Sequence, residues 1–360
     1  MDKLRETIAA VKPLDNEAMR RAQERQDQLT KPQGSLGVLE DLSIRLAGMR
    51  GDALPAVNRK VVIVMAGDHG VVEEGVSAFP QEVTPQMVAN FAAGGAAINV
   101  LGRHVGADVR VVDVGVAAPI DIPGVIGRKV RPGTANMVKG PAMSKEEAAA
   151  AIEAGIEVAE AEIAAGADLL ITGDMGIGNT TPSSAILTVF SGAELQLTVG
   201  RGTGINTGAL EMKREVVRRA IAINQPDPAD GLDVLAKVGG LEIGGLAGVI
   251  LGAAANHVPV IIDGFISTAA AMIAASLCAE SRSYMIASHV SMEPGHKLML
   301  EELGLKPMLF MDMRLGEGTG GALASSLVEA ATRVLGEMAT FADAGVAEKS
   351  DTRPQASTAD

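Results

Sequence analysis

The sequence predicts an α/β protein with a doubly wound, mostly parallel sheet that is flanked by helices, and a small helical domain formed by both chain ends. Between about residues 60 and 316, short apolar segments rich in β-branched residues alternate with Ala-rich segments of helical length. Strands that are apolar throughout are typical of a parallel sheet covered on both faces. Hydrophobic residues make up 47% of the 360 residues, which is enough to fill a large core.

The first fifty residues are expected to be helical. A polar helix is predicted over 16–28, after Pro13, and a second helix follows that carries its apolar residues on one stripe. That stripe consists of Leu36, Leu39, Leu42, Leu46 and Met49. The connecting segment, LTKPQGSLG, contains one Pro and two Gly residues, which predict a defined turn.

The central region supplies the strands of the sheet and the helices between them. The strand candidates are VVIVMA (61–66), VRVVDV (109–114), DLLITG (168–173), VPVIIDG (258–264) and MLFMDM (308–313). The helix candidates are 84–104, 145–165, 181–191, 208–223, 241–255 and 265–280. Such an alternation of strand and helix is what a sheet built from βαβ units requires.

The C-terminal region returns to helix. From the segment GEGTGG onward, apolar residues recur every three or four positions, at Leu323, Leu327, Ala331, Val334, Met338 and Phe341. We expect residues 1–50 and 322–344 to form the small helical domain, and residues 58–321 to form the large domain that carries the active site. The polar residues 345–360 are expected to form a flexible tail.

Charge and composition exclude several classes of function. Asp and Glu (44) outnumber Lys and Arg (31), so the net charge of −13 argues against nucleic acid or an anionic membrane as a partner. The single cysteine, Cys278, excludes internal disulfides and Cys-based metal sites, and its apolar neighbours predict a buried thiol. The charged N-terminus has no signal-peptide core, and the apolar run over 243–262 is interrupted by Gly, Asn, His and Pro. These features predict a soluble, cytoplasmic protein.

An aspartate lies at or just after the carboxyl end of each strand candidate. These residues are Asp68, Asp113, Asp174, Asp263 and Asp312. Ligands of open parallel sheets bind outside the carboxyl ends of the strands, so these carboxylates mark the edge where a site is expected. The alternative is that several of them only cap the helix that follows, which is the more frequent role for an Asp in this position.

Two glycine-rich loops between a strand and a helix are candidates for ligand binding. In GDMGIGNTT (173–181), the glycines allow backbone N–H groups to approach a phosphate at the positive end of a helix. In MRLGEGTGG (313–321), Glu317 stands between Gly316 and Gly318, so no adjacent side chain shields its carboxylate from a ligand. An acidic residue favoured by the dipole of the following helix is an equally good interpretation of Glu317.

Other polar residues give weaker signals. VGRGTGI (199–205) is followed by Lys213 on a predicted helix, and Lys213 and Arg201 are either phosphate-binding cations or solvated side chains. The segment SHVSMEPGH (288–296) contains two His and one Glu without the spacing of a zinc-binding helix, so a loop held by side-chain hydrogen bonds is expected. His69 in AGDHG is interpreted as a loop or sheet-end histidine rather than a base.

These loops closely resemble those of the nicotinate-nucleotide–dimethylbenzimidazole phosphoribosyltransferase family. The matching segments run in order along nearly the whole chain: LTKPQGSLGVLEDL (29–42), AGDHGVVEEGVSAFPQEVTPQMVANF (66–91), GDMGIGNTT (173–181), VGRGTGI (199–205), ASHVSMEPGH (287–296) and FMDMRLGEGTGGALA (310–324). The resemblance implies a large doubly wound domain, a small helical domain from both chain ends, and a homodimer in which the partner's small domain helps to wall the cavity.

The reaction that the resemblance implies joins nicotinate mononucleotide and 5,6-dimethylbenzimidazole to give α-ribazole 5′-phosphate and nicotinate, in the assembly of the cobalamin lower ligand. The incoming benzimidazole must lose its N–H proton, so one carboxylate base is required. The nicotinate nitrogen leaves neutral and needs no acid. Because the leaving group is nicotinate and not pyrophosphate, no metal or cofactor is expected.

By resemblance, Glu317 is this base and Asp174 supports it. The family has Glu more often where Asp174 stands, and the shorter side chain reaches about 1.5 Å less far. The GDMGIGNTT loop, with Met175, Gly176, Gly178, Asn179 and Thr180, is expected to hold the nucleotide together with Lys213. Gly202, Arg314 and Gly316 are further residues expected to bind substrate. The residues expected to line the benzimidazole pocket are Ser77, Gln86, Met87 and Leu315.

Two other functions fit the same residues. A non-catalytic nucleotide-binding or sensor protein would use the glycine loops to hold a ligand, and Glu317 would then only cap a helix. A metal-dependent phosphotransferase would use the aspartates at the sheet edge. Turnover of the two substrates in the presence of a chelator distinguishes these functions from the phosphoribosyltransferase.

Overall fold

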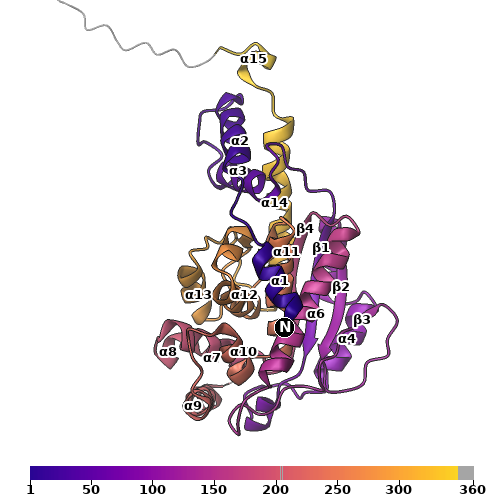
Figure 1. Cartoon of the computed structure of the whole chain (residues 1–360), viewed down its shortest axis with the longest axis vertical. Helices are drawn as coiled ribbons and strands as arrows, with labels where there is room; N and C mark the ends of the chain where they lie inside the picture. The colour runs from indigo at the N-terminus through magenta and orange to yellow at the C-terminus, as the bar shows by residue number, and fades with distance from the viewer. Residues whose placement is uncertain (203, 205, 348–360) are drawn as a thin grey trace, which may run out of the picture.

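The centre of the molecule is a six-stranded, all-parallel sheet, as seen in the computed structural model, which describes residues 1–202, 204 and 206–347. Its order is β3-β2-β1-β4-β5-β6 (Figure 1). The strands are β1 (Lys60–Gly67), β2 (Ala107–Gly115), β3 (Val125–Gly127), β4 (Leu169–Met175), β5 (Val260–Ile262) and β6 (Met285–Ala287). The predicted fold class is therefore confirmed.

The order of the strands reverses between β1 and β4. From β1 the chain adds β2 and then β3 on one side, and it then crosses over to add β4, β5 and β6 on the other. In an open α/β sheet the loops on either side of such a reversal separate, and a ligand crevice forms at the carboxyl ends of the strands. Met65 of β1 pairs with Asp174 of β4 at this position.

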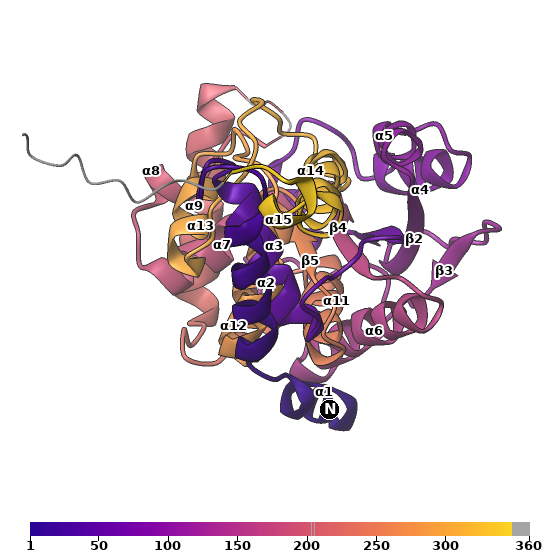
Figure 2. The same cartoon turned by 90° about the horizontal axis from the view of Figure 1, so that it is seen from above.

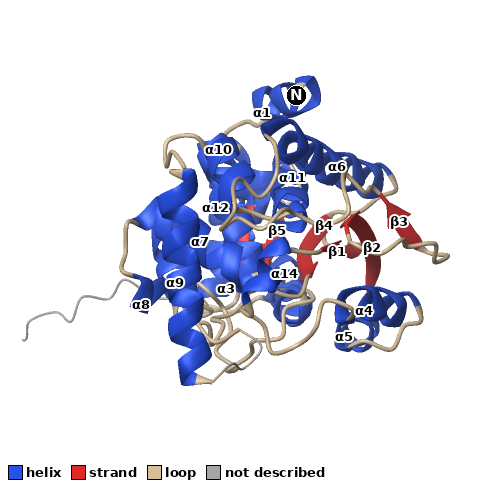
Figure 3. Ribbon diagram, turned by 90° about the horizontal axis from the view of Figure 1, so that it is seen from below, coloured by secondary structure: helices blue, strands red, loops and turns tan. Residues whose placement is uncertain are grey.

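Helices cover both faces of the sheet, which explains why the strands are apolar throughout (Figure 3). One face packs on α6 (Lys145–Ala164), α10 (Gly231–Val238), α11 (Leu241–Ala255) and α12 (Phe265–Leu277). The other face packs on α3 (Val38–Arg50), α4 (Val83–Ala92), α5 (Ala97–Val105) and α14 (Thr319–Glu337). Along β1, the side chains of Val61, Ile63 and Met65 enter the first core, and those of Val62, Val64 and Ala66 enter the second.

Glycines allow α6 and α11 to pack unusually closely. A Cβ atom built on Gly155 of α6 would lie 1.8 Å from the carbonyl oxygen of Gly245, and one on Gly248 of α11 would lie 1.9 Å from that of Ile152. The two helices lie side by side in Figure 2, with α1 (Asp2–Ala10) across their end. A larger residue at these positions would therefore push the helix backbones apart.

The end of α14 extends beyond the sheet and meets other helices there. Leu335 of α14 forms a small separate core with Ala22 of α2 (Asn16–Gln28) and Ala47 of α3. These helices and α15 (Phe341–Ala344) lie together at one end of the molecule (Figure 1). Helix α1 lies apart from this group: Leu4 belongs to the core on the α6 and α11 side.

The remaining elements surround the edge of the sheet near β5 and β6 or follow β1. They are η1 (Gly70–Glu74), α7 (Thr180–Ser191), α8 (Leu195–Thr198), α9 (Thr207–Asn224), η2 (Ala279–Tyr284) and α13 (Gly295–Leu303). Cys278 follows α12 and is buried, as its apolar neighbours predict. Within the described part of the chain, no helix has both the length and the apolar character needed to cross a membrane.

Two element predictions are wrong. Residues 308–313 form no strand: only Leu309 makes a bridge, to His289, and Phe310 and Met311 are exposed. The helix expected over 84–104 is two helices, α4 and α5, because Gly94 takes a left-handed conformation between them (φ +78°). The tail expected over 345–360 lies outside the described residues from 348 onward.

Candidate active site

A cavity of about 250 Å³ opens at the carboxyl ends of the strands. The loops that follow β4, β5 and β6 line it, together with the segment that precedes α14. Of the site residues predicted from the sequence, those that line it are Asp174, Asn179, Thr180, Gly202, Arg314, Leu315 and Gly316. The strand order thus gathers residues from widely separated segments at the position that the reversal of the sheet provides.

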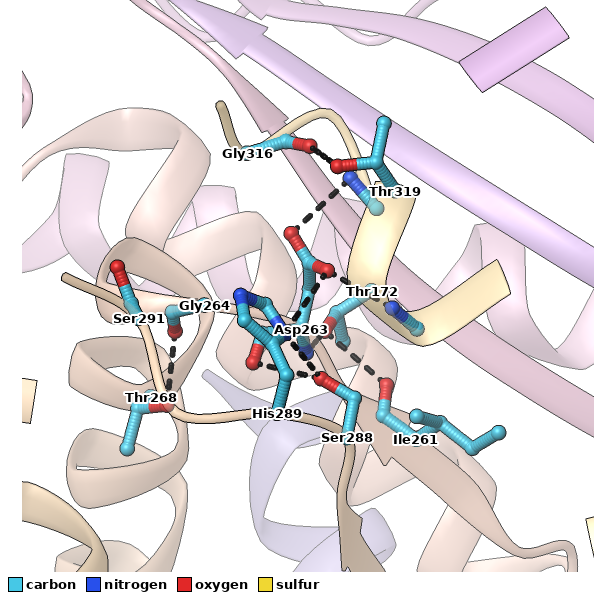
Figure 4. A network of polar contacts seen from close by, with 12 residues as sticks. Thr172, Ile261, Asp263, Gly264, Thr268, Ser288, His289, Ser291, Gly316 and Thr319 are labelled. Carbon is cyan, nitrogen blue, oxygen red and sulfur yellow. Dashed lines mark hydrogen bonds and ion pairs between the residues drawn. The ribbon is translucent and has the colours of Figure 1, made fainter. Parts of the chain in front are cut away.

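Asp263, at the end of β5, fixes the start of α14. Its two carboxylate oxygens accept hydrogen bonds from the N–H groups of Gly318 (3.2 Å) and Gly321 (2.9 Å). Figure 4 shows Asp263 among its neighbours Thr172, Ser288 and Thr319. The backbone of Asp263 is held in turn, since its N–H donates to Thr172 Oγ1 (3.1 Å) and its carbonyl accepts from Ser288 Oγ (3.0 Å). Asp263 therefore caps a helix and links the sheet to the loop that contains Glu317.

Glu317 lies in this loop with a backbone conformation that is costly for any residue except glycine. Its φ is +62°, and the flanking Gly316 and Gly318 have φ values of +83° and +88°. A left-handed conformation of a non-glycine residue costs on the order of 1–3 kcal/mol and is common at functional sites. The loop also runs against β4: a Cβ on Gly173 would lie 2.6 Å from the Glu317 carbonyl oxygen.

The Glu317 carboxylate is buried beside helix α5. The residue is 6% exposed, and its Oε2 accepts a long hydrogen bond from the N–H of Ile98 (3.4 Å). Burial raises the pKa of Glu317, and the nearby Asp263 carboxylate raises it further. Glu317 does not line the 250 Å³ cavity itself; its neighbours Leu315 and Gly316 do. A carboxylate with a raised pKa and few hydrogen-bond partners is suited to accept a proton at neutral pH.

Asp174 lies between the Glu317 loop and the cavity. A Cβ on Gly316 would be 3.1 Å from Asp174 Oδ1, so the loop backbone contacts this carboxylate directly. Asp174 Oδ2 accepts a hydrogen bond from Asn179 Nδ2 (2.9 Å), whereas Oδ1 has no partner in the described part of the chain. Burial raises the pKa of Asp174 well above its usual range, and the charges of Asp263 and Glu242 add to this. Asp174 is therefore more easily protonated than an exposed aspartate.

The loop after β4 leads directly into the N-terminus of α7. Gly176 packs so closely that a Cβ there would be 2.3 Å from the carbonyl oxygen of Gly67, and Gly178 has a φ of +90°. Met175 is buried at the end of β4. Asn179 and Thr180, at the start of α7, line the cavity. The positive end of a helix dipole thus faces the cavity, an arrangement that favours an anion.

Lys213 of α9 lies directly behind this helix start. Its side chain is completely buried, and its ammonium group donates a hydrogen bond to Thr180 Oγ1 (2.7 Å). A Cβ on Gly202 would be 3.3 Å from Lys213 Nζ, so the backbone at Gly202 passes close to the same group. Burial lowers the pKa of Lys213 to about 8. Arg314 adds a second cation at the rim.

Of the four residues expected around a benzimidazole, only Leu315 lines the cavity. Ser77 accepts a hydrogen bond from the N–H of Phe79 (3.2 Å), Gln86 is exposed on α4, and Met87 is partly buried against the core beneath α4. None of these three lines the cavity, whereas Leu315 (59% exposed) and Phe79 do. Sequence reasoning misses Phe79, although it lies within the segment that carries the resemblance.

A buried acid–base pair beneath the site also escapes sequence analysis. His69 Nε2 lies 2.7 Å from Glu242 Oε1, and neither side chain is more than 1% exposed. Burial alone lowers the pKa of His69, but the Glu242 carboxylate reverses this and raises it. The pair supports Gly176, where a Cβ would lie 3.2 Å from His69 Nε2. The only signal in the sequence is a lone acidic residue at the start of an apolar helix.

The 288–296 segment is held by hydrogen bonds, as expected. His296 Nδ1 accepts from the N–H of Ser291 (2.8 Å), so its proton lies on Nε2, which donates to Thr268 Oγ1 (2.9 Å). Burial lowers the pKa of His296 to about 3, which keeps the ring neutral. No group of three or more His, Cys, Asp or Glu side chains in the described residues is arranged to hold a metal ion.

Comparisons with known proteins agree with this geometry. A family model described as "Phosphoribosyltransferase" matches residues 11–346. The nicotinate-nucleotide–dimethylbenzimidazole phosphoribosyltransferase of Desulforudis audaxviator is 58% identical over 349 residues, which cover 97% of this chain and 99% of that protein. The protein of the same name from Chloroflexus aggregans is 58% identical over 98% of this chain and its own full length.

Solved structures show the same fold. The crystal structure of CobT from Thermus thermophilus matches with a TM-score of 0.89 and 49% sequence identity. The match covers 92% of this chain and 100% of that one. A second structure from the same organism, titled as the nicotinate-nucleotide–dimethylbenzimidazole phosphoribosyltransferase, matches with the same TM-score at 48% identity.

Proposed function

Since the chain belongs to the nicotinate-nucleotide–dimethylbenzimidazole phosphoribosyltransferase family, we propose that its cavity binds nicotinate mononucleotide and that Glu317 deprotonates the incoming base. The chain is a phosphoribosyltransferase of cobalamin lower-ligand assembly. It moves the 5-phosphoribosyl group from nicotinate mononucleotide to 5,6-dimethylbenzimidazole. The products are α-ribazole 5′-phosphate, nicotinate and a proton.

The reaction is a displacement at C1′ of the ribose. A benzimidazole nitrogen forms a bond to C1′ while the bond from C1′ to the nicotinate nitrogen breaks, and the electron pair of that bond stays on nicotinate. The configuration at C1′ inverts through an oxocarbenium-like transition state. The benzimidazole N–H proton passes to Glu317, whose raised pKa and single long hydrogen bond support this role.

In this proposal the nucleotide lies with its phosphate at the positive end of the cavity. The N-terminus of α7, the buried Lys213 behind Thr180, and Arg314 at the rim supply the positive potential. Asp174 lies between this end and the Glu317 loop. A protonated Asp174 donates a hydrogen bond toward the ribose or the leaving group without repelling the phosphate, which supports an assisting role for it.

We place the benzimidazole against Leu315, between the Glu317 loop and helix α4. Leu315 is more than half exposed beside the cavity and lies two residues before the base. Helix α4 is joined to the nucleotide loop because the N–H of Ile177 donates to Thr84 Oγ1 (3.1 Å). Gln86 and Met87 on this helix, with Ser77 before it, are the remaining residues of the proposed pocket.

The proposal includes a homodimer of chains with two domains each. In the proposed division the large domain spans 58–321 and the small helical one comprises 1–50 with 322–344, except that α1 packs on the α6 and α11 side of the large domain. Exposed apolar side chains near the cavity support a subunit contact there: Phe310 is 78% exposed, and Met311 and Leu315 are more than half exposed. The proposed location is the cytoplasm, which is compatible with a single buried cysteine that has no disulfide partner.

A turnover assay tests this function. Purified protein is incubated with nicotinate mononucleotide and dimethylbenzimidazole, with and without a chelator, and α-ribazole 5′-phosphate and nicotinate are measured. We expect equal amounts of both products in both incubations. Binding of the nucleotide without turnover would identify a nucleotide-binding protein instead, and loss of turnover with chelator would require a metal.

A further inference from the structure

Glu293 is a buried carboxylate in the nucleotide cavity that the proposed mechanism does not use. It lies in the segment between β6 and α13, lines the cavity, and is 7% exposed. Its Oε2 has no hydrogen-bond partner in the described part of the chain. Its position is tightly defined, because a Cβ on Gly200 would lie only 2.0 Å from Oε2.

Cations surround Glu293 without forming a close ion pair with it. Lys213 of α9 and Arg314 of the segment before α14 are the positive groups that act on it, and the N–H of Gly202 donates a hydrogen bond. Lys213 directs its own short hydrogen bond to Thr180 instead. On its own segment, His296 is neutral, and His289 also lines the cavity. Asp174, whose pKa burial raises, lines the cavity as well.

The phosphate of the nucleotide needs the same cations. Glu293 and Arg314 both line this cavity of about 250 Å³, and Lys213, buried behind Thr180, acts electrostatically on Glu293, so a phosphate dianion held by these cations lies near Glu293 as well. A phosphate dianion and a charged Glu293 carboxylate that share this small site repel each other strongly. Once phosphate neutralises Lys213 and Arg314, only the hydrogen bond from the Gly202 N–H remains, of these three interactions, to favour a charged Glu293.

We propose that Glu293 is ionised in the empty site and takes up one proton from solvent when the 5′-phosphate binds, and that its carboxyl group then donates a hydrogen bond to a phosphate oxygen. This inference rests on the proposed function of the cavity. It makes Glu293 a further substrate-binding residue that recognises a phosphate monoester. A neutral ligand would leave the Glu293 carboxylate charged and would not receive this hydrogen bond. Burial already raises the pKa of Glu293, and Lys213 opposes that shift in the free enzyme.

Calorimetry of nucleotide binding measures this proton directly. Nicotinate mononucleotide is titrated into the intact protein at pH 7, without the second substrate, in buffers that differ in ionisation enthalpy. At this pH Lys213 is already charged, because its pKa is about 8. We expect the observed enthalpy to report the uptake of between about half and one proton. Nicotinate riboside, which lacks the phosphate, is expected to cause no uptake.

Variants assign the proton to Glu293. In Glu293→Gln, whose amide still donates a hydrogen bond, we expect proton uptake to vanish while the nucleotide Kd changes less than about tenfold. Glu293→Asp keeps a titratable group and is expected to retain uptake, which guards against a folding defect in the Gln variant. Glu301→Gln, exposed on α13, is the matched control and is expected to behave like the wild type.

Three results would overturn the inference. They are binding without buffer dependence in the wild type, uptake that persists in Glu293→Gln, and a Glu293→Gln variant that no longer distinguishes ribose from 2′-deoxyribose. The last would show that Glu293 accepts hydrogen bonds from the sugar. Failure of the proposed function is a separate outcome, because it would abolish turnover in the wild type rather than alter the proton count.

Discussion

Burial shifts the pKa values of three ionisable side chains of the site, Asp174, Glu317 and Lys213, toward their neutral forms. Burial raises the pKa of Asp174, and the neighbouring carboxylates raise it further. Burial lowers the pKa of Lys213 to about 8, so it remains a cation just below that pH. Glu317 has a raised pKa and only a long hydrogen bond from Ile98. Two carboxyl groups with raised pKa values and a lysine with a lowered pKa therefore coexist within one small site.

The role of Lys213 is tested by removing its charge without changing its length. For Lys213→Met we expect KM for nicotinate mononucleotide to rise about 10- to 100-fold with little change in kcat, because a charge on the phosphate acts equally in the ground and transition states. In the wild-type enzyme, kcat/KM is expected to fall above about pH 8, where the free enzyme loses this charge. Initial-rate kinetics from about pH 6 to 9 measure both effects.

The control for this variant is Lys297→Met, which removes an exposed lysine on α13. It is expected to leave KM unchanged. An unchanged KM in Lys213→Met itself would show that the buried lysine supports α7 through Thr180 and does not act on the phosphate.

The role of a single residue can be predicted from the sequence only where its neighbours in the chain determine its position. Glu317 is identifiable because two glycines and a strand end surround it, and its left-handed backbone explains why glycines are there. The His69–Glu242 pair is not predictable, because its members are 173 positions apart and neither lies in a periodic pattern. The sequence places Glu293 in a loop but does not show that it lies near a cation, because Lys213 belongs to a helix that is distant in the sequence.

At the scale of elements, close contacts between backbones determine how the helices pack around the sheet. Glycines on α6 and α11 bring the two backbones together under the sheet. A single carboxylate, Asp263, joins the end of β5 to the start of α14. In both contacts the atoms are already at van der Waals or hydrogen-bond distance. Small changes in side-chain size at these positions should therefore have large effects on the stability of the fold.

A pair of Gly→Ala substitutions tests this packing. Gly248→Ala places a Cβ 1.9 Å from the Ile152 carbonyl oxygen, and we expect it to lower the free energy of unfolding by about 1–3 kcal/mol or more. Gly336→Ala, on α14, meets nothing within 4 Å and should raise it by up to about 1 kcal/mol through helix propensity. Urea unfolding of both variants measures whether the free energy of unfolding falls in the first and rises in the second. A Gly248→Ala protein as stable as the wild type would contradict the close packing.

The elements that sequence analysis predicts well are those with a long, distinctive pattern. Strands β1, β2 and β4 are continuous apolar runs, and α2 and α6 begin at good capping residues, Asp15 and Ser144. Strands β3 and β6 have three residues each, too few to stand out from a loop. The apolar run over 308–313 misleads because Phe310 and Met311 are exposed and do not enter a core.

At the scale of the whole molecule, the reversal of strand order between β1 and β4 explains why the site lies where it does. Loops from β4, β5 and β6 meet on one side of this point, and the start of α14 closes the site from the other face. Fold class and the position of the site are therefore predictable from the alternation of strands and helices. The packing partner of α1 is not, because a short amphipathic helix carries no information about which surface it covers.

The proposed homodimer makes a prediction about exposed apolar residues. Light scattering at micromolar concentration is expected to give twice the mass of one chain. Phe310→Asp should shift the protein toward the monomer, because it places a charge among the exposed apolar side chains next to the cavity. Leu54→Asp is the matched control, because it changes an exposed apolar residue that does not line the cavity. A wild-type protein with the mass of one chain would contradict the dimer.

The most direct test of the account is the kinetics of Glu317→Gln, which preserves size and shape but cannot accept the benzimidazole proton. We expect kcat to fall about 10²- to 10⁴-fold while the binding of both substrates changes little, since the base acts mainly in the transition state. A melting curve must match the wild type, and Glu337→Gln at the exposed end of α14 must retain full activity. A folded Glu317→Gln enzyme with near-normal kcat would contradict the account and make Asp174 the next candidate for the base.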